Sequence, residues 1–135
     1  KCSIWTETNG VYGHPLPYKL TTKPADGGVK AIIRVDVAQA DYYKTKITHP
    51  NSFSSSPTLN DAVAWTGSTA VSQVSVAGMS AYEAAKVTYN NTTEFNMTLA
   101  GSTWFTVESE AQYGSTKALP AGNYTAMIVA ECIAK

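Results

Sequence analysis

The residues best suited to acid–base chemistry in this chain are two glutamates and two histidines. Glu108 and Glu110 are two positions apart, so on a β-strand both side chains would lie on one face. Paired carboxylates can hydrolyse a glycosidic bond, but they must then flank a sugar, and such pairs usually come from different strands. His14 and His49 each precede a proline, which favours extended or turn backbone. We therefore expect the glutamates on a solvated outer face and both histidines exposed in loops.

Motifs that would support catalysis or cofactor binding are absent from the sequence. The chain contains no phosphate-binding loop, no dinucleotide-binding glycine motif, no nucleophile elbow and no zinc-protease motif. No carboxylate stands at metal-ligand spacing from either histidine. We therefore expect that the protein is not an enzyme and that it needs no cofactor or metal ion.

The two cysteines, Cys2 and Cys132, lie close to opposite ends of the chain. Neither is in a CxxC motif or at a helix N-terminus, the settings that favour a reactive thiolate. Their positions suit a disulfide that ties the termini together in an oxidising compartment. The alternative is two unpaired, buried thiols in a cytosolic protein. The low charged fraction of 15% and the many Ser, Thr and Tyr residues favour the disulfide.

Aromatic and basic residues cluster near position 43 and could recognise a receptor. Tyr42, Tyr43 and Lys44 are consecutive, and tyrosines beside lysines can bind a sugar by stacking and hydrogen bonding. Trp65 is a further candidate for such a surface. The alternative is an ordinary strand with one tyrosine inward and one outward, together with a tryptophan in the core.

Length, charge and hydropathy narrow the classes of protein to consider. A chain of 135 residues with 44% hydrophobic residues can form one domain, residues 1–135, around one core. Ten basic and ten acidic residues give a formal net charge of zero, without a run of like charge. Binding to nucleic acid or to an anionic membrane requires a clustered basic surface, so neither is expected. No apolar run is long enough to insert into a bilayer.

Period-two alternation of apolar and polar residues runs through most of the chain. It is clearest at residues 29–37, where valine, alanine and isoleucine alternate with charged residues. Residues 80–86 form the only helical candidate. The last stretch, 119–132, starts with a Pro/Gly turn and continues as a nearly unbroken apolar strand. Seven to nine short strands with turn residues between them predict an all-β antiparallel sandwich or barrel.

Four short segments resemble a known family of proteins. Residues 101–107 (GSTWFTV), a Gly/Ser/Lys loop and residues 119–126 (LPAGNYTA) resemble the end of chaperone–usher fimbrial subunits, where a P/A-A-G-x-Y turn leads into the last strand. Residues 56–63 (SPTLNDAV) and 74–78 (VSVAG) are similar to colonisation-factor pilins of enteric bacteria. The two regions that contain these segments, 56–78 and 101–126, make up about a third of the chain.

The resemblance implies an immunoglobulin-like sandwich that lacks its seventh strand. A hydrophobic groove beside the first and last strands would then be filled by a periplasmic chaperone, and later by a neighbouring subunit that the usher assembles into the fibre. The groove residues implied for this chain are Ile4, Ala126, Ile128 and Ala130. The alternative is that these four side chains pack a sandwich that is already complete.

One feature departs from the family pattern. Fibre-forming subunits carry an alternating apolar donor segment before the first strand, whereas only Lys1 precedes Cys2 in this sequence. Three expectations stay open: a donor segment was removed, the chain is a subunit at the fibre tip, or it is the pilin domain that follows an adhesin domain. A disulfide near the C-terminus also resembles some minor tip subunits.

Three functions follow as hypotheses. The leading one is a structural or adhesive subunit of a bacterial surface fimbria, exported through the periplasm, that attaches to a host-cell receptor such as a glycan. The second is a self-contained secreted β-sandwich that binds carbohydrate, with Tyr42, Tyr43 and Trp65 as the platform. The third is a small secreted hydrolase, which would need Glu108 and Glu110 in an active site.

Overall fold

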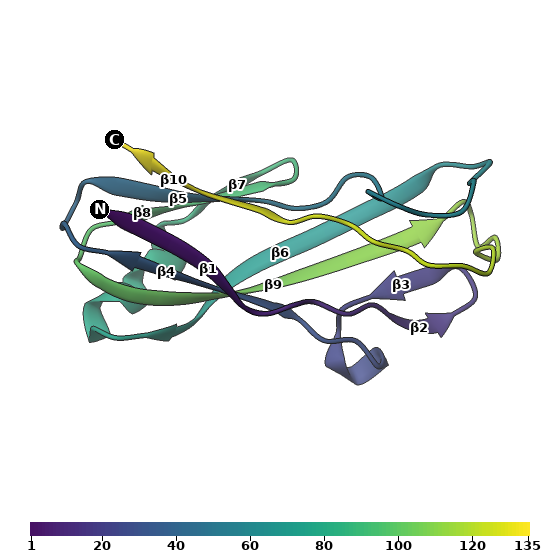
Figure 1. Cartoon of the computed structure of the whole chain (residues 1–135), viewed down its shortest axis with the longest axis horizontal. Coiled ribbons are helices and arrows are strands. Elements are labelled where there is room, and N and C mark those ends of the chain that lie inside the picture. Colours follow the sequence, from purple (N-terminus) through teal and green to yellow (C-terminus); the bar gives the residue numbers. More distant parts are fainter.

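Two antiparallel β-sheets lie face to face in the computed structural model of residues 1–135 (Figure 1). This architecture confirms the all-β sandwich that the alternating pattern predicts. The first sheet contains β1 (Cys2–Thr8), β4 (Ala31–Val37), β9 (Gly101–Tyr113), β3 (Lys19–Thr21), β2 (Gly13–Leu16) and β6 (Val63–Val74). The second sheet contains, in spatial order, β10 (Val129–Ala134), β5 (Tyr43–Thr48), β8 (Thr92–Met97) and β7 (Val87–Tyr89).

The long strand β9 organises the first sheet. One of its edges pairs with β6, and the other pairs first with β4 and then, near its end, with β3. β1 pairs with the far edge of β4 and is therefore an outer strand of this sheet. β10 pairs only with β5 and is an outer strand of the second sheet.

The core lies between the sheets and follows directly from the alternation. Every second residue of β4 is buried, and the same is true of β9 from Thr103 to Tyr113. Phe95 of β8 and Phe105 of β9 meet across the core with ring centroids 4.6 Å apart. Eleven buried side chains form the central cluster: Ala31, Ile33, Val35, Val37, Ile47, Met79, Tyr82, Phe95, Met97, Phe105 and Val107.

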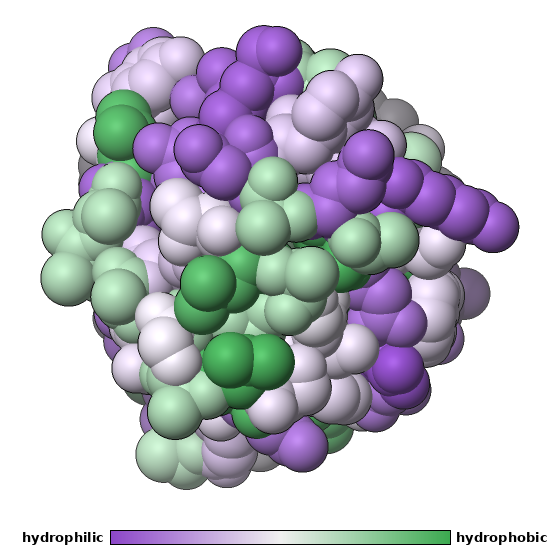
Figure 2. All heavy atoms as spheres, turned by 90° about the vertical axis from the view of Figure 1, so that its left-hand side faces the viewer, coloured by the Kyte–Doolittle hydropathy of each residue, from purple (hydrophilic) through white to green (hydrophobic).

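Short helical turns close the end of the sandwich at which both termini lie. A 3-10 turn, η2 (Ala77–Ala81), continues into the one-turn helix α1 (Tyr82–Ala85), which agrees with the helix expected near residues 80–86. Tyr82 is buried, and its hydroxyl donates to the Leu99 carbonyl and accepts from the Leu99 N–H. Figure 2 looks onto this end, where hydrophobic atoms gather near the centre with hydrophilic atoms around them. A second 3-10 turn, η1 (Pro24–Asp26), precedes β4.

Two strands differ from the expected pattern. The alternation at 63–65 and at 71–76 predicts two strands separated near Gly67, but residues 63–74 form one strand, β6, which continues through Gly67. The expected closing strand at 119–132 is a regular strand only in β10. Residues 119–128 form one isolated bridge, Ser55 to Thr125, and the Leu119 N–H donates a further backbone hydrogen bond to the Pro17 carbonyl. Apolar alternation alone does not make a strand regular, because a ladder also needs a partner edge.

His49 is a buried side chain, so the expectation that both histidines are exposed is wrong for this one. Only 4% of His49 is exposed, whereas His14 is exposed. Its Nδ1 donates to the carbonyl oxygen of Asn91 at 2.9 Å, which leaves Nε2 to accept from the Thr69 hydroxyl at 2.7 Å. Gly67 of β6 passes so close that a Cβ there would lie 2.8 Å from the ring. Burial lowers the pKa of His49, although hydrogen bonds to backbone oppose this effect.

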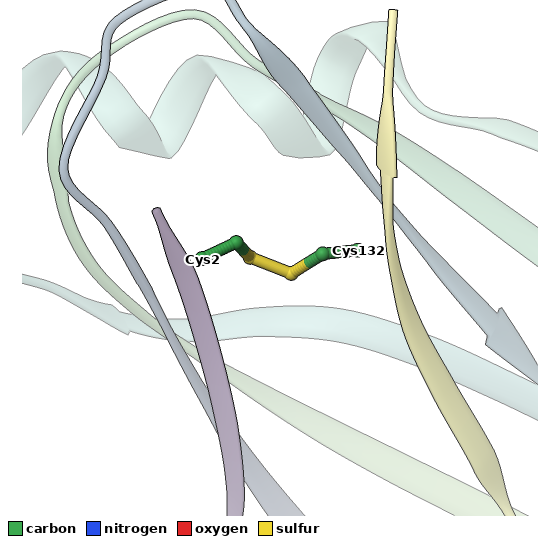
Figure 3. Close-up of a disulfide and its surroundings, with 2 residues drawn as sticks. All are labelled: Cys2 and Cys132. Atoms are coloured by element: carbon green, nitrogen blue, oxygen red, sulfur yellow. A yellow bond between two sulfur atoms is a disulfide. The ribbon is translucent and has the colours of Figure 1, made fainter.

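The predicted disulfide between Cys2 and Cys132 is present (Figure 3). It joins β1 of the first sheet to β10 of the second, and the two Cα atoms are 6.3 Å apart. Neither cysteine is free. A structural disulfide of this kind fits an oxidising compartment outside the cytosol.

Because its pKa is lowered in the folded protein, His49 should make stability depend on pH. Above about pH 6.5 the side chain is neutral in both states, and below it the unfolded chain takes up a proton that the folded chain resists. As the pH is lowered from the pKa of His49 in the unfolded chain to its pKa in the folded protein, the free energy of unfolding should therefore fall by up to about 1.4 kcal/mol per pH unit. Urea titrations between pH 7.5 and pH 5 measure this slope.

Two variants separate this contribution from that of other groups. His49→Gln should lose the slope between pH 7 and pH 5, whereas His14→Gln, changed at an exposed position, should keep it. An undiminished slope in His49→Gln would contradict the assignment.

Removal of the disulfide should destabilise the fold strongly. In the chain-entropy account, a cross-link between residues so far apart in sequence stabilises by roughly 4–5 kcal/mol. The double variant Cys2→Ser, Cys132→Ser should lose up to that amount, measured by urea unfolding against the oxidised parent. Reductant should lower the stability of the parent and leave that of the variant unchanged. Equal stability of the parent with and without reductant would refute this expectation.

Candidate functional site

Two outer strands of different sheets face each other along one side of the sandwich. β1 and β10 run antiparallel, and the disulfide ties them together (Figure 3). Each pairs through one edge only, β1 with β4 and β10 with β5. No backbone hydrogen bond joins β1 to β10. The edges that face each other are therefore unpaired.

The segment before β10 extends the same edge away from the disulfide. On one side, Thr125 exchanges backbone hydrogen bonds with Ser54 and Ser55. The backbone groups of Ala126, Met127 and Ile128 form no hydrogen bond within the chain. Side chains nevertheless alternate as in a strand, because Ala126 and Ile128 are half-buried while 65% of Met127 is exposed. The segment thus has the form of a strand without a partner on the side of β1.

Two hollows lie between this segment and the start of the chain. The first, of about 180 Å³, lies between Thr6–Gly10 and the side chains of Ala126 and Ile128, with Ala31 and Ile33 of β4 also in its lining. The second, of about 400 Å³, lies between Gly10–Tyr12 and residues 122–126, with Leu20 in its lining. Gly10 and Ala126 line both hollows, so the two are adjacent. We call this feature the terminal groove.

Contacts on the outer surface hold both walls of the terminal groove in place. On the β1 side, the Arg34 guanidinium of β4 lies 4.7 Å from the Trp5 ring of β1 and 5.1 Å from the Trp104 ring of β9. These cation–π contacts hold β1 against its own sheet. On the other side, Tyr124 stacks edge-on against Phe53, with ring centroids 5.2 Å apart. Each wall is thus packed against its own sheet or loop rather than against the opposite wall.

The chemistry of the terminal groove suits an extended, uncharged polypeptide. None of the residues that line either hollow is charged. Unpaired strand edges can bind a further strand through main-chain hydrogen bonds, with alternate side chains in the hollows. Small lining residues such as Gly10 and Ala126 leave volume for the side chains of such a strand.

The four groove residues implied by the resemblance divide into two pairs. Ala126 and Ile128 line the terminal groove. Ile4 and Ala130 lie beside the disulfide and pack against the core. Thr6, Thr8 and Gly10 also line the groove but were not among the candidates, although Thr6 shares a strand face with Cys2 and Ile4. The sequence does not predict the lining residues from other strands, because nothing local connects them to the groove: Leu20, Ala31 and Ile33.

The four receptor-binding candidates do not form one surface. Tyr42 and Tyr43 contact each other at the start of β5, with ring centroids 4.7 Å apart, and Tyr43 also packs against the core. Lys44 pairs with Glu94 on the neighbouring strand at 3.5 Å. Trp65 is on β6 in the other sheet, where it stacks edge-on against Phe53. Trp65 lines a hollow of about 280 Å³ with Phe53 and three polar residues, Asn51, Ser52 and Ser56.

Glu108 and Glu110 lie on the outer face of the first sheet, as the sequence analysis expects. Both are half-buried and both line a shallow polar hollow of about 230 Å³ that has no hydrophobic lining residue. Glu108 lies 3.6 Å from Lys30, and Glu110 lies 3.9 Å from Lys23. Each carboxylate is thus matched by a lysine, so the arrangement has the character of surface ion pairs.

No group of three or more histidine, cysteine or acidic side chains is placed to hold a metal ion. No helix of the protein is both long enough and apolar enough to cross a membrane. No protein-family model matches the chain, and no curated protein sequence is significantly similar to it.

Proposed function

We propose that this protein is a non-enzymatic subunit of a bacterial surface fimbria that accepts a β-strand from a partner chain in its terminal groove. The partner would be a periplasmic chaperone first and a neighbouring fimbrial subunit afterwards, with the usher directing the exchange. The assembled fibre would mediate attachment to a receptor on host cells. The resemblance of residues 101–107 and 119–126 to chaperone–usher subunits suggests this function, and the terminal groove supports it independently.

The observation that carries the proposal is the pair of unpaired edges that face each other across the terminal groove. Natural proteins usually shield exposed strand edges with charge, proline or a covering loop, because bare edges promote association. In this chain Ala126, Met127 and Ile128 have neither a backbone partner nor a charged neighbour in the groove lining. A partner strand would satisfy these groups and cover the half-buried Ile128 at the same time.

A supplied strand should stabilise the protein. The test appends a flexible Gly/Ser linker and nine residues of alternating threonine and valine after Lys135. If the effective concentration of the tethered strand exceeds its dissociation constant a hundredfold, the gain is about 2.7 kcal/mol. Urea unfolding measures the gain, and a tether with the same composition but without alternation is the control. An isolated chain that is monomeric, melts reversibly at high temperature and gains nothing from the tether would contradict the proposal.

Two adjacent residues provide a matched pair of variants for the same experiment. Ala126 points into the terminal groove, whereas Met127 points outward and is 65% exposed. In the tethered protein, Ala126→Glu should abolish the gain, because a carboxylate would occupy an uncharged groove. Met127→Glu should keep the gain. Equal gains in both variants would show that the tethered strand binds elsewhere.

The hollow beside Trp65 supports carbohydrate binding as a second candidate function. It combines two aromatic rings with the polar side chains of Asn51, Ser52 and Ser56, and stacked rings with hydrogen-bonding groups are what a sugar requires. If this site binds glycans, a glycan array should show binding by the monomer. Asn51→Ala should weaken it at least tenfold, whereas Asn96→Ala, changed at an exposed position on β8, should not. Equal binding by both variants would exclude the hollow.

A further inference from the structure

We infer that the Cys2–Cys132 disulfide closes one end of the terminal groove, so that the groove accepts a strand of about seven residues and no longer. This inference rests on the proposed function, because it concerns the strand that the terminal groove would accept. It assigns the disulfide a second role besides stabilisation, which is to set the length of the bound strand.

The two walls are too close together at the disulfide to admit a strand between them. Neighbouring strands in a sheet are about 4.8 Å apart, so two strands that flank a third are separated by about 9.6 Å. The Cα atoms of Cys2 and Cys132 are only 6.3 Å apart. The covalent bond prevents them from separating, and no backbone can therefore lie between them.

The two hollows begin some distance from the disulfide and have a limited length. Ile4 and Ala130, the next residues that share a face with the cysteines, pack against the core and line neither hollow. The hollows begin at Thr6 on one wall and at Ile128 on the other, and they end at Tyr12 and Gly122. Each wall therefore comprises about seven residues, which corresponds to an extended strand of about 23 Å.

The two walls can separate once the disulfide is absent. No backbone hydrogen bond joins β1 to β10, so the disulfide is the only direct bond between the two edges at this end. Without it, the edges at Ile4 and Ala130 could move apart, and the groove could extend to the level of Cys2. The walls would then comprise about eleven residues, from Cys2 to Tyr12.

The experiment measures the affinity of free peptides as a function of their length. Fluorescein-labelled peptides of five, seven, nine and eleven residues, with threonine and valine alternating, are titrated with the oxidised protein and followed by fluorescence anisotropy. Both N-terminal and C-terminal extensions of the seven-residue peptide are included, since either end could face the disulfide. The affinity should rise from five to seven residues and then stay constant within about twofold.

In the double variant Cys2→Ser, Cys132→Ser, the same titration should show an affinity that increases with peptide length beyond seven residues. Each additional buried valine contributes on the order of a tenfold gain in affinity. The eleven-residue peptide should therefore bind the variant at least tenfold more tightly than the seven-residue peptide. Circular dichroism first establishes that the variant is folded.

A second measurement does not depend on the stability of the variant. In hydrogen exchange on the oxidised protein, the eleven-residue peptide should protect amides in residues 122–128. It should add no protection in β10 beyond that given by the seven-residue peptide. Added protection in β10 with the disulfide intact would overturn the inference.

The outcomes distinguish the inference from the proposed function. If affinity for the oxidised protein increases steadily up to eleven residues, the disulfide does not limit the groove, although strand acceptance stands. If the folded variant shows the same plateau at seven residues as the oxidised protein, something other than the disulfide sets the length, and the inference fails. If no peptide of any length binds at millimolar concentration, the proposed function fails, and the inference fails with it.

Discussion

The covalent bond between Cys2 and Cys132 holds an edge strand of one sheet against an edge strand of the other, and the arrangement of this side of the sandwich depends on it. The two strands share no hydrogen bond, so their separation is set by the disulfide at one end and by packing onto their own sheets elsewhere. Where the bond acts, the edges are close together. Farther along, at Thr6 and Ile128, they diverge and the terminal groove opens.

Most of the hydrophobic core lies in the central strands, away from this open side. Nine of the eleven residues of the central cluster come from β4, β5, β8 and β9, which are central in their sheets, whereas Ile4 of β1 and Ala130 of β10 only pack against that cluster. Phe95 and Phe105 are fully buried between these strands. The residues at the open side are only half-buried and contribute less to the core. A protein built in this way can fold around its centre while one edge of each sheet stays available for a partner.

His49 shows that polar contacts, as well as the core, connect the two sheets. Its ring links the turn before β8 to Thr69 of β6, so it joins elements of the second sheet to one of the first. The close approach of Gly67 makes room for the ring. The disulfide and His49 are therefore two separate links between the sheets, one covalent and one through hydrogen bonds.

The sequence by itself determined the all-β sandwich, the one helical turn near Tyr82, the outward position of Glu108 and Glu110, and the disulfide. Alternation, turn residues and a single possible cysteine pair are local or countable properties, so no three-dimensional knowledge is needed to read them. Ala126 and Ile128 are implied as groove residues by the resemblance to fimbrial subunits, not by the alternation. Only the tertiary structure decided which edges find a partner, that Tyr43 and Trp65 are on different sheets, and that His49 is buried. These properties depend on contacts between residues that are distant in the chain, and the local pattern carries no information on them.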